Sequence, residues 1–328
     1  MPSVVAFGEL MLRLTTPGVL RFGQAGHFEA TFAGAEANVA VAIAQLGGKA
    51  EFVSKLPANE LGDRAVDELR ARRVGVESVA RGGDRIGLLF FEHGVSQRPG
   101  KVVYDRAHSA FAEAGPAEFN WRTILQDAKW LHWSGITPAL SSTAAQITAE
   151  AVSVARELGL TISFDLNYRS KLWTMEEAGA VLRPLMKSVD ICVCGPEEAR
   201  SILGATGGDA ETVARDLQQR FGFSRVAMTH REASSASTTG WSAQLFEGQE
   251  SYLSRSYEIA IVDRLGAGDC FTGALIFSLM RGDAPSHAIE FAAAASALKH
   301  TIAGDYAIIQ EREVQALLRG ATGGRVQR

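Results

Sequence analysis

Residues 263–271 read Asp-Arg-Leu-Gly-Ala-Gly-Asp-Cys-Phe and carry the strongest local pattern in this chain of 328 residues. They follow an apolar segment that is predicted to be a strand ending at Ile261-Val262, and they precede a predicted helix over residues 271–280. Glycines let the backbone turn tightly and direct successive N–H groups to one point, and a helix N-terminus attracts negative charge. The stretch is therefore predicted to bind an anion such as a phosphate beside the carboxylate of Asp269.

Two common glycine-loop motifs do not fit this stretch. A dinucleotide fingerprint G-x-G-x-x-G needs glycine at position 271, which is Phe271. A Walker A loop ends in Lys-Ser/Thr, whereas Ala274-Leu275 follow the suitably spaced Gly268 and Gly273. Two roles stay open for Asp269: a helix cap, which the local residues alone favour, and a catalytic base for a hydroxyl that attacks a phosphoryl group.

Short apolar runs alternate with amphipathic helical patterns along most of the chain, which predicts βαβ units and a mainly parallel sheet. Residues 10–33 and 85–112 break this rhythm with strand patterns and no helix, and we expect them to form a small β-sheet lid over a cleft. Predicted strands cover 4–7, 51–55, 129–133, 160–166, 190–194 and 225–229; predicted helices cover 35–46, 61–73, 147–158, 176–187, 196–203, 212–221, 271–280, 285–300 and 311–318.

The composition is that of an ordinary soluble protein, with 46% hydrophobic and 21% charged residues. A net charge of −4 provides no basic field for nucleic acid or anionic lipid. Three cysteines are too few for a disulfide framework, and Cys192 and Cys194 alternate on a predicted strand as buried thiols. No secretory signal is recognisable and no apolar run reaches the roughly 18 residues of a membrane span. We therefore expect a cytoplasmic protein without nucleic-acid or membrane partners.

Two separated segments resemble the signatures of the ribokinase-like (phosphofructokinase-B type) carbohydrate kinases. Residues 263–276, DRLGAGDCFTGALI, resemble one signature, and residues 32–48, FAGAEANVAVAIAQLGG, resemble the other, with Gly34 and Asn38 at its characteristic positions. The resemblance implies one domain over residues 1–328, with a three-layer α/β/α core, a mainly parallel sheet and a small β lid. It also implies ATP-dependent phosphorylation of a sugar hydroxyl with Mg²⁺, and it leaves a requirement for a monovalent cation such as K⁺ open.

The same resemblance gives Asp269 the role of the base. It assigns the anion hole for the transferred phosphoryl group to the backbone amides of Gly266, Ala267 and Gly268. Because Asp269 lies at a helix N-terminus, its carboxylate is expected to remain ionised at neutral pH. Phosphoryl transfer depends on positioning and charge stabilisation more than on a strong base, which agrees with these roles.

Two arginines suggest that the substrate is an acid. Tyr104 and Arg106 are two residues apart on a predicted strand and share a face, and Arg169 follows the carboxyl end of another strand. Guanidinium groups pair bidentately with carboxylates, so a pocket shared by Arg106 and Arg169 favours an anionic sugar. Residues 104–113, 133–140, 164–173 and 297–306 resemble the 2-keto-3-deoxygluconate kinase branch, which implies substrate contacts by Gly34, Asn38, Tyr104, Arg106 and Arg169.

The nucleotide side departs from the family pattern at two positions. The resemblance implies nucleotide contacts by Asn167 and Thr229. It also implies a water-mediated Mg²⁺ contact by Glu198, although an acid in the first turn of a helix is favoured by the helix dipole without any metal, so both interpretations stay open. The Asn of the family's Asn-x-x-Glu motif is Gly195 here, and the glycine of its Thr-Leu-Gly motif is Arg231. Two interpretations of Arg231 stay open: it reaches an ATP phosphate, or it is an exposed surface residue. On the substrate side, a tyrosine of the branch is replaced by Leu89.

The chain is thus predicted to phosphorylate the terminal hydroxyl of 2-keto-3-deoxygluconate, and its configuration at C4 stays open. The alternatives are a neutral-sugar kinase such as a fructokinase and a catalytically idle sugar-binding protein, which Gly195 and Leu89 would favour. A nicotinamide-dependent dehydrogenase is disfavoured by Phe271. The exposed edges of a small sheet further predict a homodimer or higher oligomer through the lid.

Overall fold

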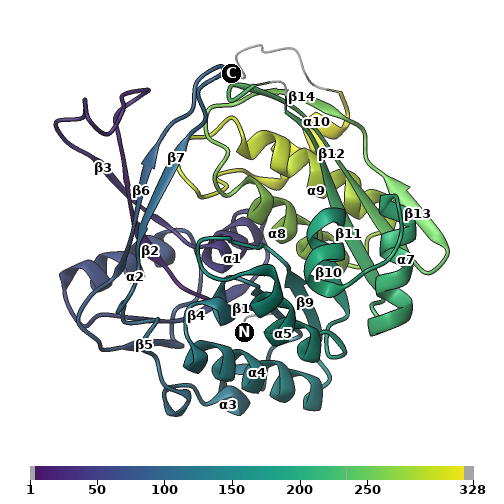
Figure 1. The fold of residues 1–328 in the computed structure, drawn as a ribbon, viewed down its shortest axis with the longest axis horizontal. Helices are drawn as coiled ribbons and strands as arrows, with labels where there is room; N and C mark the ends of the chain where they lie inside the picture. Colours follow the sequence, from purple (N-terminus) through teal and green to yellow (C-terminus); the bar gives the residue numbers. More distant parts are fainter. Residues whose placement is uncertain (1–3, 234, 321–328) are drawn as a thin grey trace.

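The computed structural model describes residues 4–233 and 235–320. Its centre is a ten-stranded sheet (Figure 1). Seven neighbouring strands of this sheet are parallel, namely β11, β10, β9, β8, β1, β4 and β5, and β12 is antiparallel to β11. In spatial order the strands are β13 (Glu250–Leu253), β12 (Thr238–Glu247), β11 (Arg225–Ala233), β10 (Ile191–Val193), β9 (Thr161–Asp165), β8 (Trp130–Ser134), β1 (Val4–Phe7), β4 (Ala50–Leu56) and β5 (Val79–Arg81), and β14 (Tyr257–Ala260) also pairs with β12.

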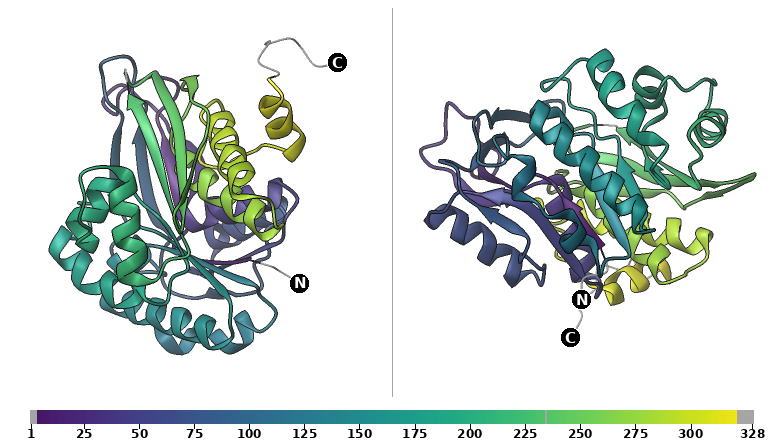
Figure 2. Two further views of the ribbon diagram at one scale, coloured as in Figure 1. Left: turned by 90° about the vertical axis from the view of Figure 1, so that its right-hand side faces the viewer. Right: turned by 90° about the horizontal axis from the view of Figure 1, so that it is seen from below.

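Helices cover both faces of this sheet and bury alternate residues of its strands (Figure 2). On β1, Val4 and Ala6 pack with one group of helices, whereas Val5 and Phe7 pack with the other, as the two-residue period of a strand requires. One face carries α1 (Ala35–Gln45), α2 (Glu60–Ala71), α8 (Ala267–Met280) and α9 (Pro285–Lys299), with α10 (Glu311–Leu318) on α9; the other carries α3 (Trp121–Leu125), α4 (Ser142–Glu157), α5 (Met175–Met186), α6 (Pro196–Glu198) and α7 (Ala210–Phe221).

The predicted three-layer α/β/α core is therefore confirmed, with shifts at particular ends. Helix α8 begins at Ala267 rather than at Phe271, because the end of the glycine-rich stretch forms its first turn. The strand before that stretch, β14, ends at Ala260, so Ile261 and Val262 lie beyond it. The helix predicted over 196–203 is α6 followed by a π-helical turn, η3 (Ala199–Leu203).

Small residues let α1 and α8 pack closely. A Cβ atom at Gly273 of α8 would lie 2.8 Å from the Cβ of Ala42 and 2.9 Å from the carbonyl oxygen of Val39 on α1. One of these atoms is a backbone oxygen of α1 and the other is a Cβ atom fixed to that backbone, so neither can move without shifting the helix. This contact holds the N-terminus of α8 next to α1.

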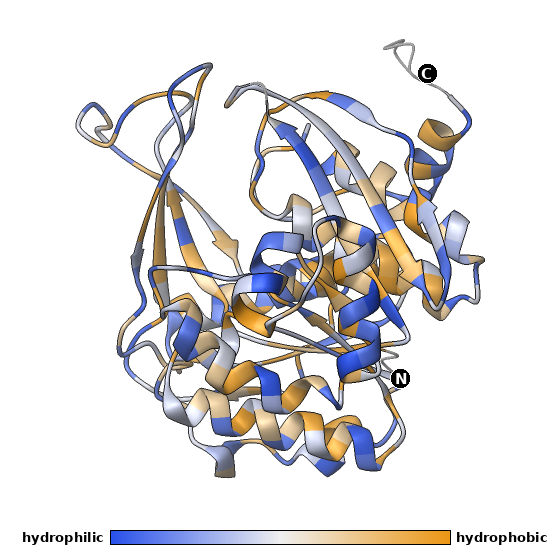
Figure 3. Cartoon of the chain, turned by 45° about the vertical axis from the view of Figure 1, so that its right-hand side comes forward, coloured by the Kyte–Doolittle hydropathy of each residue, from blue (hydrophilic) through white to orange (hydrophobic). Residues whose placement is uncertain are grey.

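The predicted small sheet is present as a separate four-stranded unit beside the core (Figure 1). Its strands carry many apolar residues (Figure 3). Between β6 and β7, the tip of this sheet reaches the β11–β12 connection: Ser96 N–H donates to Ser237 Oγ at 2.9 Å, and Ala236 N–H donates to Ser96 O at 2.7 Å. The strand order is β3 (Glu29–Ala33), β2 (Met11–Thr15), β6 (Gly87–Glu92) and β7 (Lys101–Asp105).

The buried thiols expected at Cys192 and Cys194 are confirmed, and Cys270 is also free and buried. Among the residues that the structure describes, no helix combines the length and apolar character that crossing a membrane requires.

Candidate active site

A cavity of about 470 Å³ opens where β9, β10 and β11 end, opposite the N-terminus of α8 and next to β7. Ligands of open α/β sheets bind at this end of the strands. Most of the residues predicted for the site line it. They are Tyr104, Asn167, Arg169, Glu198, Thr229, Arg231, Gly266, Gly268 and Asp269, and Asp165, Gly195 and Arg264 join them.

The carboxyl group of Asp269 lies in the first turn of α8, where Asn38 of α1 positions it. Asn38 Nδ2 donates to Asp269 Oδ2 at 2.7 Å, and Asn38 itself is buried. Asn38 Nδ2 also donates to Asp305 Oδ2 at 3.4 Å, and Asn38 does not belong to the cavity lining.

The electrostatic environment of Asp269 differs from the sequence expectation. Burial raises the pKa of Asp269 to about 7, the hydrogen bond from Asn38 opposes this rise, and the nearby Asp165 adds to it. Burial also raises the pKa of Asp165 to about 7. The prediction that Asp269 stays fully ionised at neutral pH is therefore wrong, because desolvation outweighs the favourable helix terminus. A pKa near 7 suits a general base.

The glycine-rich loop has its shape because Gly266 takes a conformation that other residues avoid. Its φ is +76°, and a Cβ atom there would lie 1.9 Å from the carbonyl oxygen of Asp305. The N–H groups of Gly266 and Gly268 have no acceptor among the described residues, whereas Ala267 N–H donates to Arg264 O at 3.3 Å. Gly266 and Gly268 are thus the parts of the predicted anion hole with free amides in this structure.

An ion-pair network that the sequence analysis missed supports this loop from the small sheet. Arg13 of β2 is buried, and its Nη2 contacts Asp263 Oδ2 at 2.6 Å while its Nη1 pairs with Asp305. Burial lowers the pKa of Arg13, but Asp305 and Asp263 together raise it above its ordinary value. Asp263 and Asp305 lie within the quoted family-like segments, but nothing in the spacing connects them to Arg13.

A buried lysine ties the same loop to the segment after α9. The side chain of Lys299 is inaccessible to solvent, and its ammonium donates to Asp263 O and Ile302 O at 3.2 Å each. Burial lowers the pKa of Lys299, and the nearby Asp263 and Asp305 carboxylates oppose that effect. The loop before Asp269 is therefore held from two sides by buried cations.

The two arginines predicted to share one pocket are placed differently. Arg169 lines the main cavity, but Arg106 is buried in an ion pair with Glu9 and lines a smaller neighbouring cavity. Tyr104 lines both cavities, and the Arg106 guanidinium lies 5.4 Å from its ring centroid. Gly34 lies outside the main lining, and a Cβ atom there would be 2.2 Å from Glu9 O.

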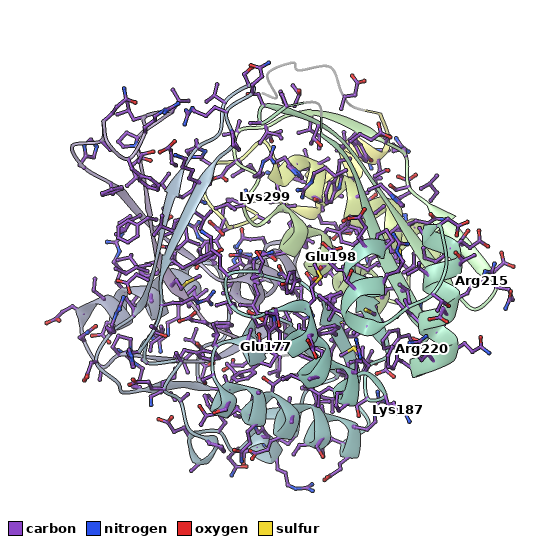
Figure 4. The ribbon with its side chains drawn as sticks, viewed as in Figure 1. Glu177, Lys187, Glu198, Arg215, Arg220 and Lys299 are labelled. Atoms are coloured by element: carbon purple, nitrogen blue, oxygen red, sulfur yellow. The ribbon has the colours of Figure 1, made fainter. Side chains whose placement is uncertain are left out.

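Two of the departures from the family pattern, Gly195 and Leu89, have structural counterparts. A Cβ atom at Gly195 would lie 2.1 Å from Glu198 Oε2, so the absent side chain leaves room for that carboxylate. Figure 4 shows Glu198 toward the centre of the molecule, while Arg215 and Arg220 lie on the outer side of α7. Leu89 of β6 is buried in an apolar cluster of the small sheet and does not line the main cavity.

Comparisons with known proteins place these features in context. The profile of the pfkB family carbohydrate kinases matches residues 1–312. A 2-dehydro-3-deoxygalactonokinase of Haloferax volcanii is 40% identical over 324 residues, covering 98% of both chains. The crystal structure of a 2-dehydro-3-deoxygluconokinase from Thermotoga maritima is 46% identical and covers 98% of this chain and 100% of its own, with a TM-score of 0.96. A fructokinase with bound ATP from Xylella fastidiosa, 23% identical, shares the fold over 98% of this chain and 100% of its own, with a TM-score of 0.82.

Proposed function

Because the chain belongs to the pfkB family of carbohydrate kinases, we propose that it transfers the terminal phosphoryl group of ATP to the terminal hydroxyl of a 2-keto-3-deoxy six-carbon sugar acid. One observation carries the proposal: the Asp269 carboxyl, the free amides of Gly266 and Gly268, and the Arg169 guanidinium all line one cavity. Two relatives at 40% and 46% identity are named as kinases of 2-dehydro-3-deoxy sugar acids, one of the galacto series and one of the gluco series.

In this proposal Asp269 accepts the proton of the sugar hydroxyl as that oxygen bonds to phosphorus and ADP leaves. The hydrogen bond from Asn38 fixes the orientation of the carboxylate, so Asn38 is a positioning residue. The amides of Gly266 and Gly268 at the N-terminus of α8 stabilise the charge on the transferred group. Positioning and charge stabilisation are the main requirements of phosphoryl transfer, and both come from this loop.

At the other end of the substrate, Arg169 holds the carboxylate of the sugar acid. Arg106 contributes through the Nη1 group that its ion pair with Glu9 leaves unused, since Nε and Nη2 both donate to Glu9. Tyr104 lies between these two arginines and provides a hydroxyl contact. An acid with a carboxylate at one end and a hydroxyl at the other would span from Arg169 to Asp269.

The nucleotide occupies the side of the cavity formed by Asn167, Thr229 and Arg231. Mg²⁺ in kinases is held by phosphates, waters and one or two carboxylates rather than by an all-protein cage. This agrees with the described residues, which contain no cluster of three or more metal-binding side chains. Glu198 fits such a role, because its carboxylate lines the cavity, and Mg²⁺ there would neutralise phosphate charge.

The substrate argument is tested by Arg169→Gln in a coupled assay of ADP release. Loss of a charged hydrogen bond is worth about 1.5–3 kcal/mol, so kcat/KM for the keto-deoxy acid should fall roughly 10- to 150-fold. Arg220→Gln is the matched control, because Arg220 pairs with Asp216 on α7 and does not line the cavity. An Arg169→Gln variant that turns over the acid as well as the wild type would contradict the proposal. Equal loss with fructose would show that Arg169 does not select the carboxylate.

A further inference from the structure

Arg264 and Arg231 reach the main cavity from two different elements. Arg264 lies in the loop between β14 and α8, two residues before Gly266, and Arg231 lies on β11, two residues after Thr229. Residues two apart on a strand share a face, so Arg231 and Thr229 point the same way. Both arginines line the cavity that contains Glu198 and the glycine-rich loop.

Each guanidinium is held by a neutral group and not by an acid. Arg264 Nη2 donates to the carbonyl oxygen of Ala236 at 3.2 Å, and the Arg231 guanidinium lies 5.7 Å from the centroid of the Trp241 ring. Among the described residues, neither arginine has a carboxylate within 4.0 Å. By contrast, Arg13, which supports the same loop, pairs with two carboxylates.

The two positive charges also act on each other. Desolvation lowers the pKa of Arg231, and the charge of Arg264 lowers it further. Two guanidinium groups that repel each other beside a helix N-terminus, with no carboxylate paired to either among the described residues, form a site of positive charge. Such a site is stabilised by a ligand that carries more than one negative charge.

We propose that Arg231 and Arg264 together bind the phosphate chain of the nucleotide, with Arg264 holding the end next to the anion loop. Guanidinium groups bind phosphates by paired, charge-assisted hydrogen bonds. Arg264 is two residues from Gly266, whose amide is proposed above to stabilise the transferred group, whereas Arg169 and Tyr104 form the part of the cavity assigned to the sugar acid. The inference rests on the proposed function for the identity of the nucleotide and adds Arg264 to its binding residues.

Arg264 also lines a second cavity of about 540 Å³ between the small-sheet tip and the β14–α8 loop. The two cavities share Val102, Arg264 and Leu265, and the second one includes Ser96 and Ala236 of the tip contact. Because the Arg264 guanidinium is bonded to Ala236, Arg264 connects the proposed phosphate site to the segment that the small-sheet tip contacts.

The test measures nucleotide affinity separately from turnover. Calorimetry with Mg-ADP and with adenosine is carried out on the wild type, Arg264→Gln, Arg231→Gln and the double variant, without sugar. Each single variant should weaken Mg-ADP binding roughly 10- to 100-fold and leave adenosine binding within two-fold, because only the phosphates contact the arginines. In the kinetic assay, the same variants should raise KM for ATP and leave KM for the sugar acid within about two-fold.

Two further variants keep the result interpretable. Arg264→Lys retains the charge without the planar fork and should recover part of the lost affinity, even if Arg264→Gln unfolds because its bond to Ala236 is gone. Arg169→Gln should show the reverse pattern, with an altered KM for the acid and unchanged Mg-ADP binding. Unchanged Mg-ADP binding in both Arg264 variants would overturn the inference. If the arginine variants lose Mg-ADP affinity but the wild type phosphorylates no keto-deoxy acid, the proposed substrate fails while the phosphate site stands.

Discussion

Two glycines of the anion loop should respond to the same substitution in opposite ways. Alanine at Gly266 faces both a φ of +76° and a Cβ position 1.9 Å from Asp305 O. The left-handed conformation costs about 1–2 kcal/mol, and forcing an atom into a packed site costs about 1–3 kcal/mol more. Alanine at Gly268 meets no atom within 4 Å and has an ordinary helical backbone.

Gly266→Ala should therefore lower the free energy of unfolding by about 2–5 kcal/mol, which in a chain of this length lowers the Tm by roughly 3–7 °C. Gly268→Ala should keep or slightly raise the Tm, because alanine is favoured over glycine in a helix. Its methyl group occupies the space where the phosphoryl group approaches, so kcat should fall roughly 10²-fold, as when an oxyanion contact is lost.

Thermal unfolding by circular dichroism and coupled ADP release measure the two effects on the same samples. Gly208→Ala is the matched control, since a Cβ there also meets nothing within 4 Å and the residue does not line the cavity. Full activity in Gly268→Ala, or wild-type stability in Gly266→Ala, would refute this account of the loop.

Three other changes have defined outcomes. The pKa of Asp269 is raised to about 7 and the base must be deprotonated, so kcat/KM should fall as the pH falls through about 7. A flat pH profile of kcat/KM from pH 6 to 8 would contradict this. Asp269→Asn should lower kcat roughly 10²–10⁴-fold without lowering the Tm at pH 8. Arg13→Met leaves Asp263 and Asp305 buried without their cation, so urea unfolding should show a loss of about 3–5 kcal/mol, and a loss below 1 kcal/mol would show that the network is not needed. Val103 lies on an edge strand of the small sheet and is 50% exposed. If the protein forms a dimer through this edge, Val103→Asp should dissociate it, which analytical ultracentrifugation measures. A monomeric wild type in the same experiment would contradict the predicted dimer.

The order of strands and helices could be predicted because the apolar periodicity of this chain is regular. Residues 4–7 and 35–45 match their predicted elements closely, and the two irregular segments form the small sheet. The antiparallel strands over residues 238–260 were not predicted, because their pairing with β11 is a long-range contact that local periodicity does not encode.

The candidate site could be predicted where a motif and a strand end coincide, as at Asp269 and Arg169. Arg13 could not be assigned, because an arginine in a predicted lid strand gives no indication that two acids more than 200 residues away neutralise it. Arg106 was expected to line the main cavity, but it pairs with Glu9. Glu9 is so far from Arg106 in the sequence that local patterns give no indication of this contact. The pKa of Asp269 also differs from the prediction, because the sequence shows the helix terminus but not the desolvation that raises this pKa.

The central claim is tested most directly by ADP release from wild-type protein with Mg-ATP and a substrate panel. The panel contains 2-keto-3-deoxygluconate, its galactonate epimer, fructose, ribose and adenosine. The account predicts selective turnover of one or both keto-deoxy acids, and comparison of the two epimers defines the preference at C4. Turnover of a neutral sugar alone would contradict the assignment of Arg169 to a substrate carboxylate.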